Sequence, residues 1–156
     1  MDISAFQPIE AITADTPEEA DRLRGLAVEA LDYIQSFVWC PPLRQVLLAY
    51  GIDGVIGLFL VRFAEPAGGV DDALWVVSGD VPPAYFVTDE APTPLEALTT
   101  YCDLMDGWVE AVLDDGDLDE AFPVNLTPTP EHAVALRAQL GFIRQLVSNQ
   151  SLHGQP

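Results

Sequence analysis

The pattern of apolar and polar positions predicts helices at both ends of the chain and strands in the middle. The first helix is predicted over residues 16–38. Its start has the capping signal Thr16-Pro17-Glu18-Glu19, and apolar residues then recur at helical spacing. A short second helix is predicted over 42–50, because it follows a proline pair and ends at Gly51, a residue that favours helix C-termini.

Three segments rich in β-branched and aromatic residues follow, at 55–61, 74–78 and 84–88. The first is apolar on both faces, which predicts a strand that is covered on both sides. The connections 65–72 and 79–83 are short and contain Gly, Pro and Asp. Short connections of this kind favour antiparallel pairing between consecutive strands.

Two further helices are predicted after the strands. One begins at Thr93-Pro94-Leu95-Glu96 and runs to about Leu113, and the other begins at Thr129-Pro130-Glu131 and runs to about Val147. The fold class is therefore α+β, in the order α-α-β-β-β-α-α, with a three-stranded antiparallel meander and four helices. We expect a single domain over 1–147 and a flexible C-terminal tail over 148–156.

Charge limits the classes of function. The 156 residues include 25 acids and six bases, all arginine, for a net charge of −19. Without lysine there is no lysine Schiff base and no P-loop lysine. The negative charge disfavours direct binding to nucleic acid or to an anionic membrane. The N-terminus has no secretory signal and the longest apolar run is too short to cross a bilayer, so a cytoplasmic location is predicted.

The acids are concentrated in one part of the chain. No basic residue lies between Arg62 and Arg137, and this stretch contains 16 of the 25 acids. On the helix predicted over 94–113, acids lie opposite the apolar face and continue past the helix end. They are Glu96, Asp103, Asp106, Glu110, Asp114, Asp115 and Asp117, and Trp108 beside them is a candidate aromatic anchor.

This acidic segment breaks two rules of local stability. Acids three or four residues apart on a helix repel each other, at a cost of roughly 0.2–0.5 kcal/mol for each pair. Asp114 and Asp115 also lie at a helix C-terminus, where the helix dipole prefers cations. Such violations suggest a functional constraint. A solvated acidic face, or internal pairing with Arg137 or Arg144, is the alternative explanation.

The leading hypothesis is a non-catalytic binding protein that docks a basic protein partner through this acidic helix. An immunity-type inhibitor of a toxin, or an accessory regulator, has the expected size and charge. The alternative is a small enzyme or small-molecule-binding domain with a site near Asp80, Tyr85 and the turn 51–57. An enzyme is the less favoured of the two, because the sequence shows no arrangement of a nucleophile and its base.

No cofactor and no metal site is predicted. Asp115-x-Asp117-x-Asp119 resembles the start of an EF-hand loop, but Glu120 and Leu126 stand where that loop needs glycine and glutamate. Cys40 and Cys102 are far apart and lack metal-ligand spacing, so free thiols are expected, with a disulfide as the alternative. The oligomeric state is left open.

The second half of the chain resembles an uncharacterised family of small acidic bacterial proteins, a domain of unknown function. The resemblance covers roughly residues 73–147. It depends on the run Trp75 to Tyr85 (WVVSGDVPPAY), on Pro92-Thr93-Pro94 with Ala97-Leu98, Tyr101 and Trp108-Val109, and on Pro123-Val124 with Pro128 to Glu131. It implies a bacterial, cytoplasmic protein and assigns no catalytic residue.

Overall fold

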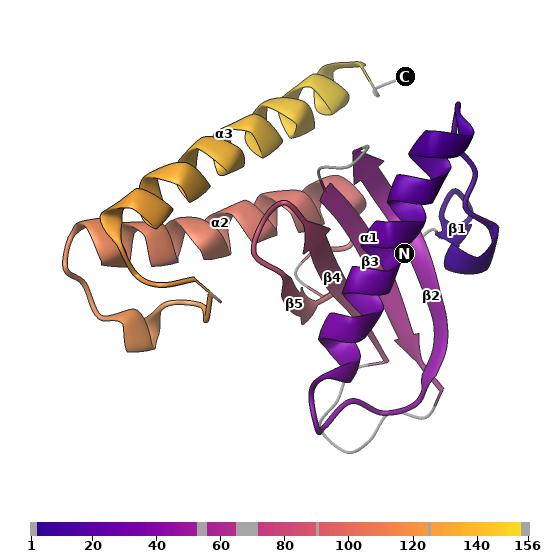
Figure 1. Cartoon of the computed structure of the whole chain (residues 1–156), viewed down its shortest axis with the longest axis horizontal. Coiled ribbons are helices and arrows are strands. Elements are labelled where there is room, and N and C mark those ends of the chain that lie inside the picture. Colours follow the sequence, from indigo (N-terminus) through magenta and orange to yellow (C-terminus); the bar gives the residue numbers. More distant parts are fainter. Residues whose placement is uncertain (1–2, 53–55, 65–71, 90, 125, 154–156) are drawn as a thin grey trace. The chain divides into compact units, whose positions relative to one another are not determined.

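The computed structural model describes residues 3–52, 56–64, 72–89, 91–124 and 126–153 (Figure 1). The chain divides into two compact units, residues 1–94 and 95–156, and we describe each by itself. The first unit contains a sheet and one long helix, and the second contains two long helices. The expectation of one domain over 1–147 stays a prediction.

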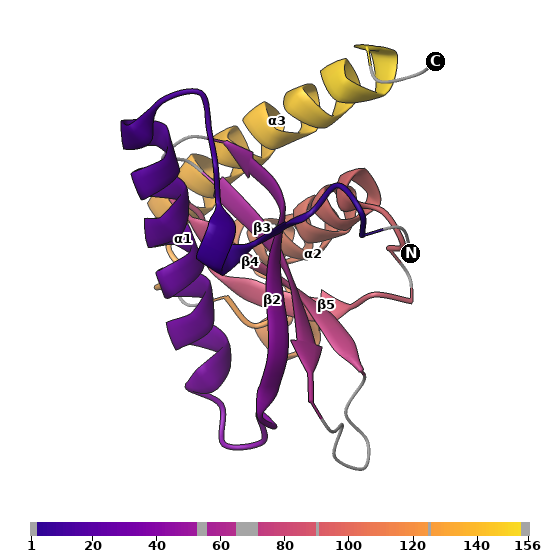
Figure 2. The same ribbon diagram turned by 90° about the vertical axis from the view of Figure 1, so that its right-hand side faces the viewer.

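The first unit is a five-stranded antiparallel sheet in which the strands lie side by side in chain order. The strands are β1 (Gln7–Pro8), β2 (Leu43–Ile52), β3 (Ile56–Phe63), β4 (Ala73–Gly79) and β5 (Ala84–Val87). The short 3-10 helix η1 (Ile9–Ala11) and the helix α1 (Pro17–Gln35) come between β1 and β2. Helix α1 covers one face of the sheet (Figures 1 and 2).

The core of this unit lies between α1 and the sheet. The buried side of α1 contacts alternate residues of β2, β3 and β4, which share one face because side chains alternate along a strand. The Ser78 hydroxyl of β4 donates a hydrogen bond to the Leu26 carbonyl of α1 at 2.8 Å. The buried Trp75 ring donates its Nε1–H to the Ala91 carbonyl at 2.7 Å, so its polar atom has a partner.

The expected three-stranded meander with four helices was wrong. Residues 42–50, predicted as a helix, form most of β2 and pair with β3 from Leu43 opposite Phe63 to Ile52 opposite Ile56. The segment is rich in helix-forming residues, but its apolar run Val46–Leu48 is buried in the sheet. A short apolar run has no periodicity that separates a strand from a helix, so tertiary pairing decides.

The fifth strand, β1, was missed because two residues are too short for a periodic signal. Gln7 and Pro8 pair with Leu48 and Leu47 at the free edge of β2. Pro8 fits an edge strand, where its missing N–H removes no ladder bond.

Gly51 was expected to end a helix, but it lies in β2 opposite Gly57. A Cβ atom at Gly51 would lie 2.6 Å from Leu23 Cδ2, so glycine allows α1 to approach the strand closely. Of the turn 51–57, residues 53–55 lie outside the described residues. The same is true of residues 65–71 in the predicted connection 65–72.

Several helix boundaries were predicted correctly. Thr16 Oγ1 accepts the N–H of Glu19 at 3.1 Å and caps α1, which ends at Gln35, slightly earlier than expected. In the second unit, α2 (Pro94–Leu113) and α3 (Pro130–His153) begin at the predicted prolines. Helix α3 continues to His153, beyond the predicted end near Val147.

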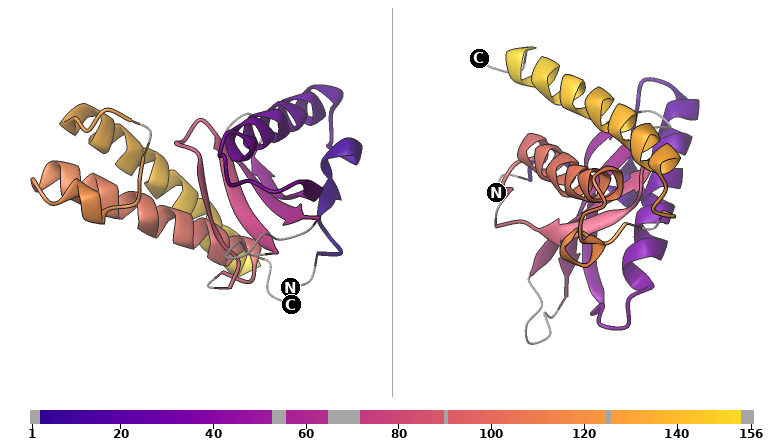
Figure 3. Two further views of the ribbon diagram at one scale, coloured as in Figure 1. Left: turned by 90° about the horizontal axis from the view of Figure 1, so that it is seen from below. Right: turned by 90° about the vertical axis from the view of Figure 1, so that its left-hand side faces the viewer.

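The second unit is a helical hairpin. Helix α3 runs back alongside α2 after the 3-10 helix η2 (Leu118–Glu120), as Figure 3 shows. Alanine and leucine side chains of α3 are buried, and the Cys102 thiol of α2 donates to the Leu140 carbonyl of α3 at 3.9 Å.

The Ser78 hydrogen bond gives a test of the first unit. We expect Ser78→Ala to lower the free energy of unfolding by about 1 kcal/mol, because a buried hydroxyl contact between sheet and helix is lost. Ser36→Ala is the matched control, since that exposed hydroxyl donates to Tyr33 O within the last turn of α1, and we expect a loss under about 0.5 kcal/mol. Urea denaturation measures both, and equal losses would contradict the packing role of Ser78.

Candidate functional site

The predicted apolar face of α2 is buried, as expected. Leu98, Cys102, Met105 and Val109 are each 1% exposed or less. Trp108 was a candidate aromatic anchor for a partner, but its side chain is only 4% exposed and presents little ring surface. Trp108 stands three residues after Met105 and seven after Tyr101, which are both fully buried, so it lies on the same side of the helix as they do.

The predicted acidic face of α2 divides into a paired part and an unpaired part. In the paired part, the Arg144 guanidinium of α3 donates hydrogen bonds to the Asp103 carboxylate at 3.0 Å and to the Asp106 carboxylate. Both contacts are ion pairs between partly exposed side chains. Arg144 therefore offsets the repulsion between two acids that lie one helical turn apart.

The ion pairs also affect two pKa values. The hydrogen bond to the Asp106 carboxylate raises the pKa of Arg144 above its ordinary value. Partial burial acts in the opposite direction, and the hydrogen bond to Asp103 adds to the rise. Burial raises the pKa of the Cys102 thiol to about 11, while the nearby Arg144 charge lowers it and the charges of Asp106 and Asp103 raise it. Cys102 is therefore a protonated thiol at neutral pH and not an activated nucleophile.

The unpaired part lies where α2 ends. We call it the acidic end and define it as six exposed carboxylates: Glu110, Asp114, Asp115, Asp117, Asp119 and Glu120. Within the described part of the chain no basic side chain forms an ion pair with any of them. Glu96 is also exposed, but it stands fourteen residues before Glu110, which is about 21 Å along a helix. It therefore does not belong to this group.

The backbone at the acidic end adopts a helix-terminating motif that usually contains glycine. Asp115 has a φ of 53°, and the Gly116 N–H donates to the Ala111 carbonyl at 2.7 Å. This geometry is a Schellman cap, in which the residue with positive φ is most often glycine. An aspartate there has a strained backbone and also places a negative charge at the negative end of the helix dipole.

The loop after α2 is ordered by one of its own acids. The Asp117 carboxylate accepts the N–H of Asp119 at 2.9 Å and caps η2. Asp117 thus has a structural role, while Glu110, Asp114 and Asp115 have no such contact in the described structure. In the described structure, no stabilising contact explains why acids occupy these three positions of the predicted surface.

The alternative site near Asp80 and Tyr85 does not converge on one cavity. Asp80 is exposed in the connection between β4 and β5, next to Gly79, whose φ of 128° requires glycine. A cavity of about 180 Å³ lies nearby. Its wall includes Glu29 and Tyr33 of α1 and residues on either side of Asp80, but neither Asp80 nor Tyr85 lines it. Ser78 in the wall of this cavity already donates its hydroxyl hydrogen bond to the Leu26 carbonyl.

Tyr85 instead belongs to an aromatic cluster. Its ring centroid lies 5.1 Å from those of Phe37 and Trp39 and 6.2 Å from that of Tyr33. Burial, with a smaller contribution from Tyr85, raises the pKa of Tyr33 to about 12. A tyrosine that holds its proton so strongly is a poor general base at neutral pH. The cluster attaches the end of α1 to β5.

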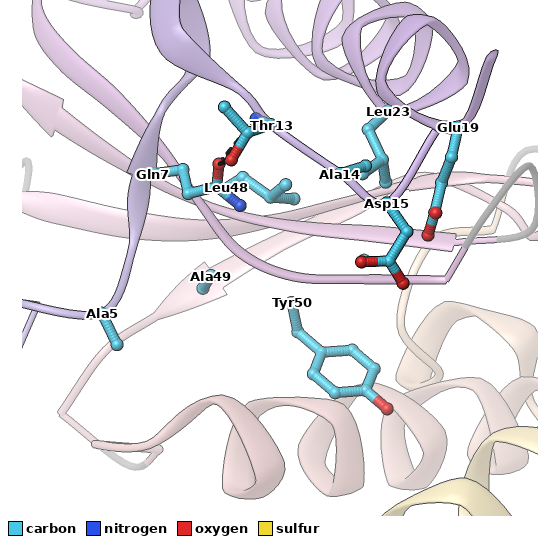
Figure 4. A pocket seen from close by; sticks show the side chains of 11 residues that line it. Ala5, Gln7, Thr13, Ala14, Asp15, Glu19, Leu23, Leu48, Ala49 and Tyr50 are labelled. Carbon is cyan, nitrogen blue, oxygen red and sulfur yellow. Dashed lines mark hydrogen bonds between the residues drawn. The ribbon is translucent and has the colours of Figure 1, made fainter. Parts of the chain in front are cut away.

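A second cavity in the first unit was not predicted. It has a volume of about 240 Å³ and lies between the segment before α1 and the end of β2 (Figure 4). Gln7 Oε1 accepts hydrogen bonds from the Thr13 N–H at 2.7 Å and from the Thr13 hydroxyl at 3.0 Å, so these polar groups serve the fold. The remaining polar wall is formed by Asp15, Glu19 and Tyr50, which no sequence motif connects.

Three further features bear on chemistry. Both cysteines are free thiols. In the described ranges, no group of three or more His, Cys, Asp or Glu side chains is placed to hold a metal ion. None of the helices described is long and apolar enough to cross a membrane.

Comparison with models of known protein families, with curated proteins and with solved structures finds no match. The resemblance of residues 73–147 to a family of small acidic bacterial proteins therefore stays a prediction.

The Arg144 ion pairs can be tested with a double-mutant cycle. We expect Asp106→Asn and Arg144→Gln to couple by about 0.5–1 kcal/mol in the free energy of unfolding, since the pair is partly exposed. The coupling should shrink in about 1 M NaCl. Asp114→Asn with Arg144→Gln is the control and should show no coupling. Equal coupling in both cycles would contradict a specific pair.

The backbone of Asp115 gives a second test. We expect Asp115→Gly to raise the free energy of unfolding by about 0.5–1 kcal/mol, because it removes both the strained backbone and the unfavourable charge. Asp115→Ala removes the charge but keeps a Cβ atom at positive φ, so it should gain less. Thermal and urea denaturation compare the three proteins. A glycine variant less stable than the wild type would contradict this description of the cap.

Proposed function

We propose that the protein is a non-catalytic binding protein whose acidic end docks a basic surface of another protein. The supporting observation is the combination of features at one place. Glu110, Asp114 and Asp115 are exposed carboxylates that form no ion pair with any residue the structure describes. They cluster at a helix C-terminus, and Asp115 has a strained backbone. Repulsion between the carboxylates, negative charge at a helix C-terminus and the strained backbone all lower stability, and a partner that supplies cations would offset the first two.

The docking residues proposed here are fewer than those predicted from the sequence alone. Arg144 offsets one of the two negative charges of Asp103 and Asp106, so this pair attracts a basic partner less strongly than two unpaired carboxylates would. Trp108 is buried and does not contribute an exposed ring. The docking surface is thus shorter than the whole helix face and is centred on its last turn and the following loop.

The net charge of −19 supports fast, salt-sensitive association with a basic partner. A toxin enzyme with a basic substrate groove, or a basic component of a larger assembly, would present the required arginines and lysines. In this proposal the protein is an immunity-type inhibitor or an accessory regulator.

The test uses the tagged protein and two matched triple variants in a capture experiment at low salt. The acidic-end variant is Glu110→Gln/Asp114→Asn/Asp115→Asn. The control variant, Glu18→Gln/Glu29→Gln/Asp32→Asn, removes the same charge from exposed positions of α1. We expect the wild type and the control to retain a basic protein that about 0.5 M NaCl releases, and the acidic-end variant to lose it.

Unfolding measurements accompany the capture experiment. The acidic-end variant should be more stable than the wild type, so its loss of binding cannot result from unfolding. If the basic protein binds all three equally, the acidic end is not the docking surface. If the wild type retains no basic protein, the proposed function is wrong.

A further inference from the structure

One cavity of the first unit has the size of a small organic molecule. It has a volume of about 180 Å³ and lies between α1 and the connection from β4 to β5. Its wall consists of Glu29 and Tyr33 from α1 together with Ser78, Gly79, Val81 and Pro83. For comparison, an apolar cavity of roughly 150 Å³ is large enough to hold benzene. The cavity therefore has room for one small ring or one short alkyl chain.

Two polar groups of this cavity are not used by the fold. They are the Glu29 carboxylate and the Tyr33 hydroxyl, which stand four residues apart and so lie on the same side of α1. In the described ranges, Glu29 forms no ion pair and the Tyr33 hydroxyl forms no hydrogen bond. Ser78, by contrast, donates its hydroxyl hydrogen bond to the Leu26 carbonyl. A ligand in the cavity would thus meet one carboxylate and one hydroxyl that have no other partner.

The rest of the wall offers apolar contact. Val81 is buried and Pro83 is partly buried. The Tyr33 ring adds an aromatic surface, and contacts with the rings of Phe37 and Tyr85 hold it in place. Gly79, whose φ is 128°, contributes only backbone to the wall, so no side chain fills the cavity at this point.

Charge decides which class of ligand fits. Among the described residues that line the cavity none is basic, and its one charged group is the Glu29 carboxylate. The net charge of −19 on the whole chain also disfavours an anionic ligand. Burial keeps Tyr33 a neutral phenol at neutral pH, because it raises the pKa of Tyr33 to about 12. A neutral phenol accepts a hydrogen bond from an ammonium group, and its ring face attracts a cation.

We propose that this cavity, which we call the Glu29 cavity, binds a small organic cation, an ammonium group carried on one small ring or short alkyl chain. The ammonium group pairs with the Glu29 carboxylate and donates to the Tyr33 hydroxyl. The apolar part of the ligand contacts Val81 and Pro83. This site lies in the first unit, uses none of the residues of the acidic end and does not rest on the proposed docking function.

An NMR titration of the ¹⁵N-labelled protein tests the charge and shape of the ligand with three compounds that share one ring. Cyclohexylamine is a cation at neutral pH, cyclohexanol is neutral and cyclohexanecarboxylate is an anion. We expect cyclohexylamine to shift the amide signals of Gly79 and Val81 with a dissociation constant of about 0.1–1 mM. Cyclohexanol should bind at least about tenfold more weakly, because it lacks the charge, and the carboxylate should not bind.

Three single variants test the residues at about 0.15 M NaCl. Glu29→Gln should weaken the binding of cyclohexylamine about tenfold, and Tyr33→Phe, which keeps the ring, about threefold. Asp32→Asn is the matched control, since it removes an exposed carboxylate of α1 that does not line the cavity. It should keep the wild-type affinity within about twofold.

Three results would overturn the proposal. The first is a wild type that does not bind cyclohexylamine at about 10 mM, roughly ten times the weakest expected dissociation constant. The second is equal affinity for cyclohexanol, which would show that the carboxylate takes no part. The third is an equal loss of affinity in Asp32→Asn and Glu29→Gln, which would show that the cation is attracted only by the general charge of the surface.

Discussion

One cation offsets negative charge on the outer face of the helical hairpin. The second unit contains ten acids and two arginines, and Arg144 is the arginine that joins α3 to the carboxylates Asp103 and Asp106 of α2. Without it, two acids one helical turn apart would repel each other along the same helix. The buried face of α2 supplies apolar packing, and Arg144 makes that packing compatible with an acidic outer face.

Arg144 forms ion pairs with Asp103 and Asp106 but with no acid nearer the end of α2. In the described structure, the carboxylates of the acidic end are therefore left without a cation. At Glu110, Asp114 and Asp115 the charges are exposed and unpaired in the described structure, and the backbone of Asp115 has positive φ. A chain selected for stability alone would place glycine at the cap and a cation near the helix C-terminus. The stability lost here is therefore the strongest indication of a binding surface. In the cavities of the first unit, the side chains of Gln7, Thr13 and Ser78 already form hydrogen bonds within the fold.

The sequence predicted the elements that have strong local signals. Capping residues located the starts of three helices, and the β-branched segments located β3, β4 and β5. The residues of β2 were misassigned because Leu, Gln and Ala favour a helix locally, while pairing with β3 across the chain favours a strand. For the candidate site, spacing alone placed the acids on one side of α2. It could not show that Arg144, 41 residues after Asp103, pairs with two of them, because that contact depends on the hairpin.

Uncompensated charge is concentrated at the acidic end, and we propose that it destabilises the fold there. The gain in unfolding free energy between about 0.05 and 0.5 M NaCl measures this effect, since salt screens exposed like charges. It compares the wild type with the two matched triple variants, of the acidic end and of α1. Neutralising the acidic end should remove most of this gain, whereas the α1 variant should keep it. Equal salt dependence in the two variants would contradict this proposal, because it would show that the charge is merely distributed over the surface.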